Sequence, residues 1–200
     1  MTPRQKQDIL DRWELTEKEL TEIIDQNPSM RGLMLGYVAE YKLKQMHFTD
    51  PRFTSVTKDD DHDRKKKGDL RVTYRGRDFK IECKSLQTKT VKLENNIWTG
   101  KYQCDASDRR EVTFKDGSKL NTTCLLTSEF DLIAVNMFAF GEKWHFGFAL
   151  NDNLPRSRYK KYTEIQREQL LSSLMPITLP LQSPYSESPF PLLDQLIDGA

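Results

Sequence analysis

The segment at residues 68–85, "GDLRVTYRGRDFKIECKS", restricts the possible fold of this chain more than any other stretch. Apolar residues occupy alternate positions on both sides of Gly76, and charged or polar residues occupy most of the positions between them. Successive side chains of a strand point to opposite faces, so this pattern predicts two antiparallel strands. The segment therefore predicts a β-hairpin with one apolar face and one face rich in charge.

The hairpin is predicted to bring two acids and a lysine together. With a two-residue turn at residues 76–77, Asp69 opposes Lys84 on the polar face. In the same register Arg71 opposes Glu82, which is diagonal to Asp69. Opposed residues lie about 5 Å apart at Cβ and diagonal ones about 7–8 Å apart. Asp69, Glu82 and Lys84 are therefore expected to form one cluster.

This cluster has the residue types that cut a phosphodiester bond. Two carboxylates at such a distance can hold a hard divalent cation through oxygen ligands, typically Mg²⁺, with Mn²⁺ as a substitute. A bound cation lowers the pKa of water and offsets charge that develops on a phosphate. The ammonium group of Lys84 could contact the scissile phosphate or orient the water. The cluster predicts a metal-dependent phosphodiesterase.

The pattern Asp69-x12-Glu82-x-Lys84 resembles the signature of the PD-(D/E)xK nuclease superfamily, although Gly68 stands where proline is commoner. The resemblance implies the restriction-endonuclease-like fold, an α/β (α+β) architecture with a mixed central sheet flanked by helices. It also implies that the acids are catalytic metal ligands and that Lys84 positions the water or the phosphate. The backbone carbonyl of Cys83 is a further metal ligand in this interpretation.

Members of this superfamily often add a glutamate from the helix before the first core strand. The segment "RGLMLGYVAEYKL" supplies Glu40 at that place, which the resemblance makes a catalytic metal ligand. The implied function is a Mg²⁺-dependent DNA endonuclease in a restriction or defence role, acting as a homodimer on double-stranded DNA. The alternatives are a repair or junction nuclease of the same fold, or a non-catalytic DNA-binding subunit with a vestigial site.

A purely structural interpretation of the hairpin is also open. Asp69–Lys84 and Arg71–Glu82 could be ordinary cross-strand ion pairs on a solvated surface. Exposed ion pairs contribute at most about 1 kcal/mol to stability, so this interpretation leaves the concentration of charge without a purpose.

The middle of the chain is basic. Residues 58–92 hold twelve lysines and arginines against seven acids, whereas residues 1–30 hold four against seven. A local excess of positive charge indicates a surface that binds a polyanion. The side chains predicted to contact DNA are those that precede or line the hairpin and those of the segment "SDRRE", which could contact base edges: Lys65, Lys66, Lys67, Arg71, Arg109 and Arg110.

Helices are expected at residues 4–25, 28–46 and 159–174. Strands are expected at residues 52–57, at 69–84, on both sides of Asp116-Gly117, and at 130–140 and 143–150. One nuclease domain is predicted over residues 1–175, with its core at about 28–150. The proline-rich residues 176–200 are predicted to form an extended arm.

Composition excludes several other classes of protein. The three cysteines are never spaced as Cys-x-x-Cys, which argues against a zinc ribbon and for a reducing, cytoplasmic environment. The chain has no apolar run of the roughly 18 residues that cross a bilayer, so no membrane association is expected. It also has no glycine-rich loop that would cradle phosphates, so no nucleotide cofactor is expected.

Overall fold

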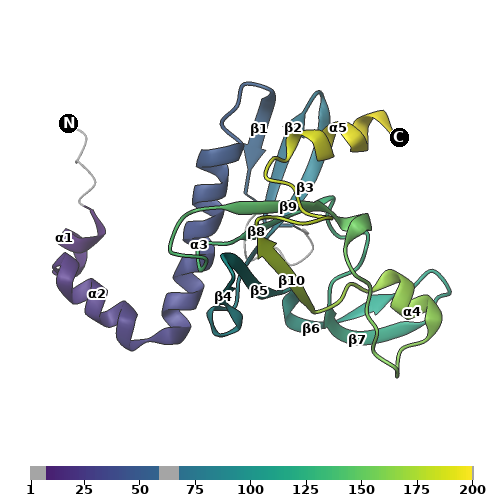
Figure 1. Ribbon diagram of the computed structural model, residues 1–200, viewed down its shortest axis with the longest axis horizontal. Coiled ribbons are helices and arrows are strands. Elements are labelled where there is room, and N and C mark those ends of the chain that lie inside the picture. Colours follow the sequence, from purple (N-terminus) through teal and green to yellow (C-terminus); the bar gives the residue numbers. More distant parts are fainter. Residues whose placement is uncertain (1–7, 59–67, 200) are drawn as a thin grey trace, which may run out of the picture. The chain divides into compact units, whose positions relative to one another are not determined.

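The computed structural model describes residues 8–58 and 68–199, and the chain divides into two compact units, Met1–Val38 and Ala39–Ala200 (Figure 1). The helices are α1 (Ile9–Trp13), α2 (Glu17–Gln26), α3 (Pro28–His47), α4 (Glu164–Gln169) and α5 (Phe190–Asp198), with short 3-10 turns η1 (Thr88–Thr90) and η2 (Asn151–Asn153). The strands are β1 (Phe53–Thr57), β2 (Leu70–Tyr74), β3 (Arg77–Ser85), β4 (Lys92–Glu94), β5 (Ile97–Gln103), β6 (Asp105–Thr113), β7 (Lys119–Cys124), β8 (Leu132–Asn136), β9 (Phe146–Leu150) and β10 (Leu174–Leu179).

The first unit is helical, but its first helix is broken. The sequence predicted one helix over residues 4–25, whereas α1 ends at Trp13 and Glu14 adopts a left-handed φ of 54°. Thr16 then starts α2 with a capping box, in which the Thr16 and Glu19 side chains each accept a hydrogen bond from the other's backbone N–H. This cap satisfies free donors at the start of a new helix, which explains the interruption. The expected start of α3 at Pro28 is confirmed.

A five-stranded sheet in the order β1-β2-β3-β8-β9 forms the centre of the second unit. Strands β3 and β8 are parallel, and all other neighbours in this sheet are antiparallel. Two smaller sheets have the orders β10-β5-β4 and β6-β7. The predicted mixed α and β class, with a multistranded sheet and helices, is confirmed.

The two faces of the central sheet pack on different layers. On one face, the C-terminal half of α3 and helix α5 contribute Leu43 and Leu193 to a core with Val72, Ile81 and Phe148. The other face carries alternate residues of β8 and β9 into a second core with residues of β5 and β10. Strand β3 therefore runs between two covered faces, and side chains on both its sides lie in or beside a core.

The hairpin of β2 and β3 forms as predicted, but its register differs by two positions. Leu70 pairs with Ile81 and Tyr74 with Arg77, so the turn is at residues 75–76 rather than 76–77. Arg75 and Gly76 have φ values of 48° and 77°, as a type I′ turn requires. A shift of two positions keeps every side chain on its face. The predicted faces are thus correct, and the predicted partners are wrong.

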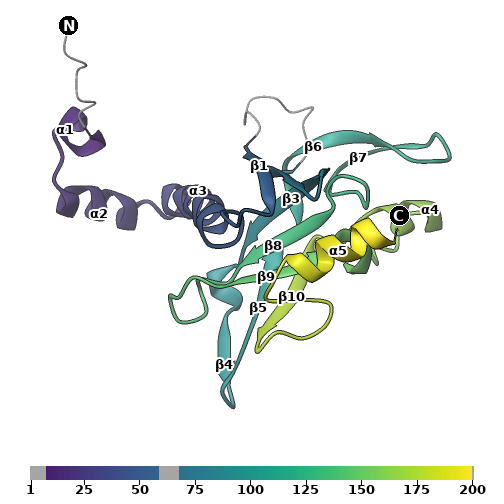
Figure 2. The same cartoon turned by 90° about the horizontal axis from the view of Figure 1, so that it is seen from above.

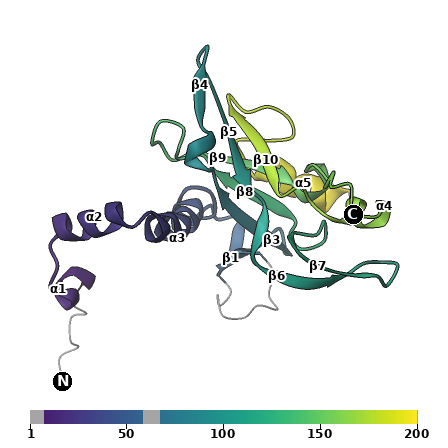
Figure 3. The same cartoon turned by 90° about the horizontal axis from the view of Figure 1, so that it is seen from below.

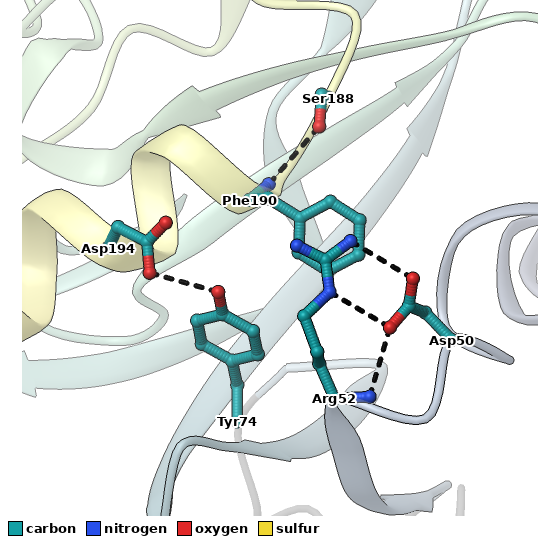
Figure 4. A network of polar contacts seen from close by, with 6 residues as sticks. All are labelled: Asp50, Arg52, Tyr74, Ser188, Phe190 and Asp194. Carbon is teal, nitrogen blue, oxygen red and sulfur yellow. Dashed lines mark hydrogen bonds and ion pairs between the residues drawn. The ribbon is translucent and has the colours of Figure 1, made fainter.

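The C-terminal segment differs from the extended arm that its prolines suggested. Strand β10 pairs with β5, and helix α5 packs on the core with Leu193 fully buried. Figure 4 shows how α5 is held: the Tyr74 hydroxyl donates to Asp194 at 2.9 Å, and the guanidinium of Arg52 lies 3.5 Å from the Phe190 ring centroid. Local composition could not reveal strand β10, because its partner β5 lies some seventy residues earlier in the sequence.

Of two further predicted elements, one is shorter than expected and the other is confirmed. The helix expected at residues 159–174 is only α4, because residues 170–171 instead make isolated bridges to other segments. The predicted hairpin around Asp116-Gly117 is confirmed as strands β6 and β7, which project as a two-stranded ribbon in Figure 2. Among the described residues, no helix combines the length and apolarity that a membrane crossing needs.

Candidate functional site

Strand β3 carries the centre of the candidate site. Glu82 and Lys84 alternate with Ile81 and Cys83, so they point to the face opposite the α3 and α5 core. In the parallel pairing with β8, Glu82 lies beside Ile133, and Ile133 belongs to the second core. The polar face of the hairpin is therefore covered by protein over this part of β3, and Glu82 is only 8% exposed.

Glu82 and Lys84 form a close ion pair in this covered position. Their Oε1 and Nζ atoms are 2.7 Å apart, and their side chains are 10% and 21% exposed. Burial opposes the charged form of Lys84, but the carboxylates of Glu82 and Asp69 outweigh it and raise its pKa. Lys84 is consequently an ammonium ion at neutral pH.

Glu82 titrates far from the usual range of a carboxylic acid. Burial raises its pKa to about 7, and the neighbouring Asp69 carboxylate acts in the same direction while Lys84 acts against both. Ionising a second carboxylate next to Asp69 is unfavourable, because like charges repel in a poorly solvated place. A cation between the two acids would relieve that repulsion.

Asp69 lies close to Glu82 and Cys83. It comes just before β2, where the paired residues of the hairpin end at Leu70–Ile81, and its charge helps to raise the pKa of Glu82. Asp69 is fixed there by its backbone, whose N–H donates to the Ile81 carbonyl at 2.9 Å. Its Oδ2 accepts a hydrogen bond from the Cys83 N–H at 2.7 Å. The predicted cluster of Asp69, Glu82 and Lys84 is present with altered cross-strand partners.

Glu40 belongs to helix α3, whose core lies on the face of the sheet opposite to Glu82 and Lys84. Its Oε2 lies 2.6 Å from Nζ of Lys58, which follows β1, and its side chain is 16% exposed. Burial raises the pKa of the Cys83 thiol, and the charges of Asp69, Glu40 and Glu82 add to this effect. The charge of Glu40 therefore acts on Cys83, whereas the charges that act on Glu82 are those of Lys84, Asp69 and Glu129.

The donor set suits a hard cation. Asp69, Glu82 and Glu40 offer carboxylate oxygens, and the Cys83 backbone offers a carbonyl oxygen, which are the ligands that Mg²⁺ takes. Across the residues that the structure describes, no three His, Cys, Asp or Glu side chains are already gathered as a metal cage. Each acid instead has another partner: Lys84 for Glu82, the Cys83 N–H for Asp69, and Lys58 for Glu40.

The residues predicted to bind DNA have different surroundings. Lys65, Lys66 and Lys67 lie outside the described residues. Arg71 opposes Lys80 rather than Glu82, and Arg109 is exposed on β6.

Arg110 belongs to a different setting. Its guanidinium makes a very short contact with Glu129, and their side chains are 21% and 9% exposed. The segment predicted as a base-reading loop is a strand, and along it Arg109 and Arg110 point to opposite faces. Arg110 is therefore placed to hold the ribbon to the protein, whereas Arg109 is free to meet a ligand.

Sequence reasoning missed Glu129 and Lys58 as neighbours of the site. Glu129 is 8% exposed, and its charge helps to raise the pKa of Glu82. Its position immediately before the apolar run at 130–140 was a usable signal, because an acid at the edge of a buried strand needs a partner. Lys58 gave no such signal, since its contact with Glu40 depends on how β1 meets α3.

Comparisons with models of known protein families, with characterised proteins and with solved structures give no match for this chain.

Proposed function

We propose that this chain is a Mg²⁺-dependent DNA endonuclease of the PD-(D/E)xK type, with a restriction-endonuclease-like fold. Mn²⁺ would substitute for Mg²⁺. The mixed sheet, the hairpin at its centre and the preceding helix with its glutamate support this proposal. A restriction or defence role, exercised by a homodimer on double-stranded DNA, is the form of the proposal that we favour.

The carrying observation is the buried Glu82–Lys84 pair with the Asp69 carboxylate near enough to raise the pKa of Glu82. An ordinary cross-strand ion pair would be solvated and would contribute little. Here the pair is largely removed from water, where desolvation makes charges costly unless they serve a purpose. Acids with a perturbed pKa that contact a lysine are typical of catalytic sites. A reactive role explains the arrangement better than stabilisation does.

Asp69, Glu82, Glu40 and the Cys83 carbonyl would hold the cation. When bound, Mg²⁺ would supply Lewis acidity toward the phosphodiester and would make water easier to deprotonate. Glu82 would release its proton on binding the cation, because its pKa of about 7 leaves it partly protonated at neutral pH. Lys84 would leave Glu82 for the phosphate or the water. It would act as a fixed positive charge and hydrogen-bond donor, not as a base, because its pKa is raised.

Incubation of purified protein with supercoiled plasmid tests the proposal. We expect nicked and linear DNA with Mg²⁺ or Mn²⁺, and intact plasmid with EDTA. Ca²⁺ should support binding without cleavage, because it fits oxygen ligands but holds them in a looser geometry. Plasmid that stays intact with both Mg²⁺ and Mn²⁺, while Ca²⁺ still supports binding, would favour the non-catalytic DNA-binding subunit.

A further inference from the structure

A second basic surface lies far along the chain from the candidate site. Residues 156–161, "RSRYKK", which we call the basic loop, hold four cations and no acid. The loop lies between η2 and α4 in the second unit. The helix predicted at residues 159–174 included only residues 159–161 of this loop, and no function was predicted for its charge.

The basic loop is held in place from within. Nη1 of Arg156 donates to the carbonyls of Asn151 and Leu154 at 3.1 and 2.9 Å. The Ser157 N–H donates to the Leu170 carbonyl at 2.8 Å. At the other end, Nη1 of Arg167 donates to the Tyr162 carbonyl at 2.8 Å. Two arginines thus fix the backbone of the loop.

The remaining three cations point to solvent. Arg158, Lys160 and Lys161 are exposed, and within residues 8–58 and 68–199 no carboxylate lies within ion-pair distance of them. The hollow between the loop and α4, of about 390 Å³, is lined by Arg156, Arg158 and Arg167 but also by Glu164 and Glu168. The acids make the hollow itself a poor anion site. The outer edge of the loop carries uncompensated positive charge.

The basic loop is continuous with the β6–β7 ribbon. Tyr162, the residue after the loop, packs on the cluster that includes Val112 and Phe114 of the ribbon. Gln169 of α4 accepts a hydrogen bond from the Lys115 N–H at 3.3 Å. In Figures 1 and 2, α4 lies beside the ribbon that carries Arg109. The loop therefore lies beside the ribbon face that carries Val112, whereas Arg109 points to the other face of the ribbon.

We infer that the basic loop is a DNA-backbone contact, in which Arg158, Lys160 and Lys161 bind phosphates of a duplex that also meets the β6–β7 ribbon. This inference rests on the proposed function for its partner. Rigidly held, unpaired cations with a tyrosine between them match a polyphosphate track, because each cation that meets a phosphate releases condensed counterions. Such contacts set position and affinity and carry no sequence information.

The test measures binding without cleavage. Arg158→Ala, Lys160→Ala and Lys161→Ala are combined in one variant, and affinity for a short duplex is measured in Ca²⁺ by fluorescence anisotropy over a range of salt. The matched control is Lys89→Ala, Lys92→Ala and Lys101→Ala, which removes the same charge from exposed positions at η1 and β4–β5. The β4 end of that hairpin and α4 lie well apart in Figure 3.

We expect the loop variant to bind at least roughly tenfold more weakly at low salt, with a salt slope smaller by about 2–3 than that of the wild-type protein. The loss should be the same for unrelated duplex sequences, and the control should retain most of its affinity and slope. Melting curves should coincide, because the three exposed side chains form no hydrogen bond or ion pair within residues 8–58 and 68–199. Equal binding by the loop variant and the wild type, or equal losses in the loop and control variants, would overturn the inference and leave the nuclease proposal intact. A wild-type protein that binds no DNA would overturn both.

Discussion

At the scale of single residues, the candidate site is defined by what surrounds Glu82. This acid pairs with a lysine on its own strand and feels the charge of Asp69, just before β2, on a sheet face that protein covers. The sequence predicted these three residues as a cluster, because alternation along strands is a local property. It could not predict their burial, which comes from strands β5 and β10 in a layer contributed by later parts of the chain.

Lys84→Ala separates a catalytic lysine from an ion-pair partner. We expect the variant to bind DNA in Ca²⁺ like the wild type but to cleave about 100-fold or more slowly in single turnover, because a positioned charge or proton donor commonly contributes that much. Lys80→Ala is the control, since Lys80 lies on the same face of β3, four residues before Lys84. A Lys84→Ala protein that cleaves at the wild-type rate and shows only a lower melting temperature would remove Lys84 from the mechanism.

Glu82 predicts a dependence of stability on pH. Its pKa of about 7 in the folded protein exceeds the ordinary 4.5, so the folded state holds this proton to higher pH than the unfolded chain does. The contribution of Glu82 to stability is therefore full below about pH 4.5 and is lost as pH rises through about 7. Urea unfolding of the metal-free protein should show this loss.

Glu82→Gln should flatten that part of the pH profile, because glutamine does not ionise. Glu111→Gln, at an exposed acid paired with Lys119, should leave the profile unchanged. Mg²⁺ should raise the melting temperature of the wild type more at high pH than at low pH, since the cation competes with the proton. Parallel profiles for wild type and Glu82→Gln would mean that Glu82 is an ordinary acid.

At the scale of elements, those specified by local sequence signals were predicted, and those that depend on long-range pairing were not. Helix α3, the β2–β3 hairpin and the β6–β7 ribbon were predictable because a proline at the first helical position, an alternation or an Asp-Gly turn specifies each of them. The exact register of β2 and β3 was not, since turns at residues 75–76 and 76–77 give the same two faces. Strand β10 was not predicted, because its partner β5 lies far away in sequence and the prolines of this segment favoured an arm.

Helix α5 gives a test of the C-terminal segment. Leu193→Ala is expected to lower the free energy of unfolding by about 2–5 kcal/mol, because it empties a fully buried position in the core. Leu174→Ala, at a residue that is 43% exposed on β10, should have a much smaller effect. Urea unfolding at one pH compares them. If Leu193→Ala is as stable as the wild type, the segment behaves as the loose arm that its composition suggested.

At the scale of the whole molecule, we assign different tasks to different parts of the second unit. The central sheet carries the acids and the lysine, and the ribbon with the basic loop carries exposed cations. The basic centre of the chain was visible in the sequence, whereas the loop at residues 156–161 became visible only with its surroundings. A charge excess averaged over a segment does not say which cations already have partners, as Arg110 and Arg158 illustrate.

The central claim is that Asp69 and Glu82 support metal-dependent cleavage of DNA. The most direct measurement is the single-turnover cleavage rate in Mg²⁺ of Asp69→Ala and Glu82→Ala beside Glu111→Ala, with circular dichroism to verify folding. The account predicts that wild type and Glu111→Ala cleave at similar rates and that both site variants are folded and inactive. Cleavage at the wild-type rate by a folded Asp69→Ala or Glu82→Ala protein would contradict it.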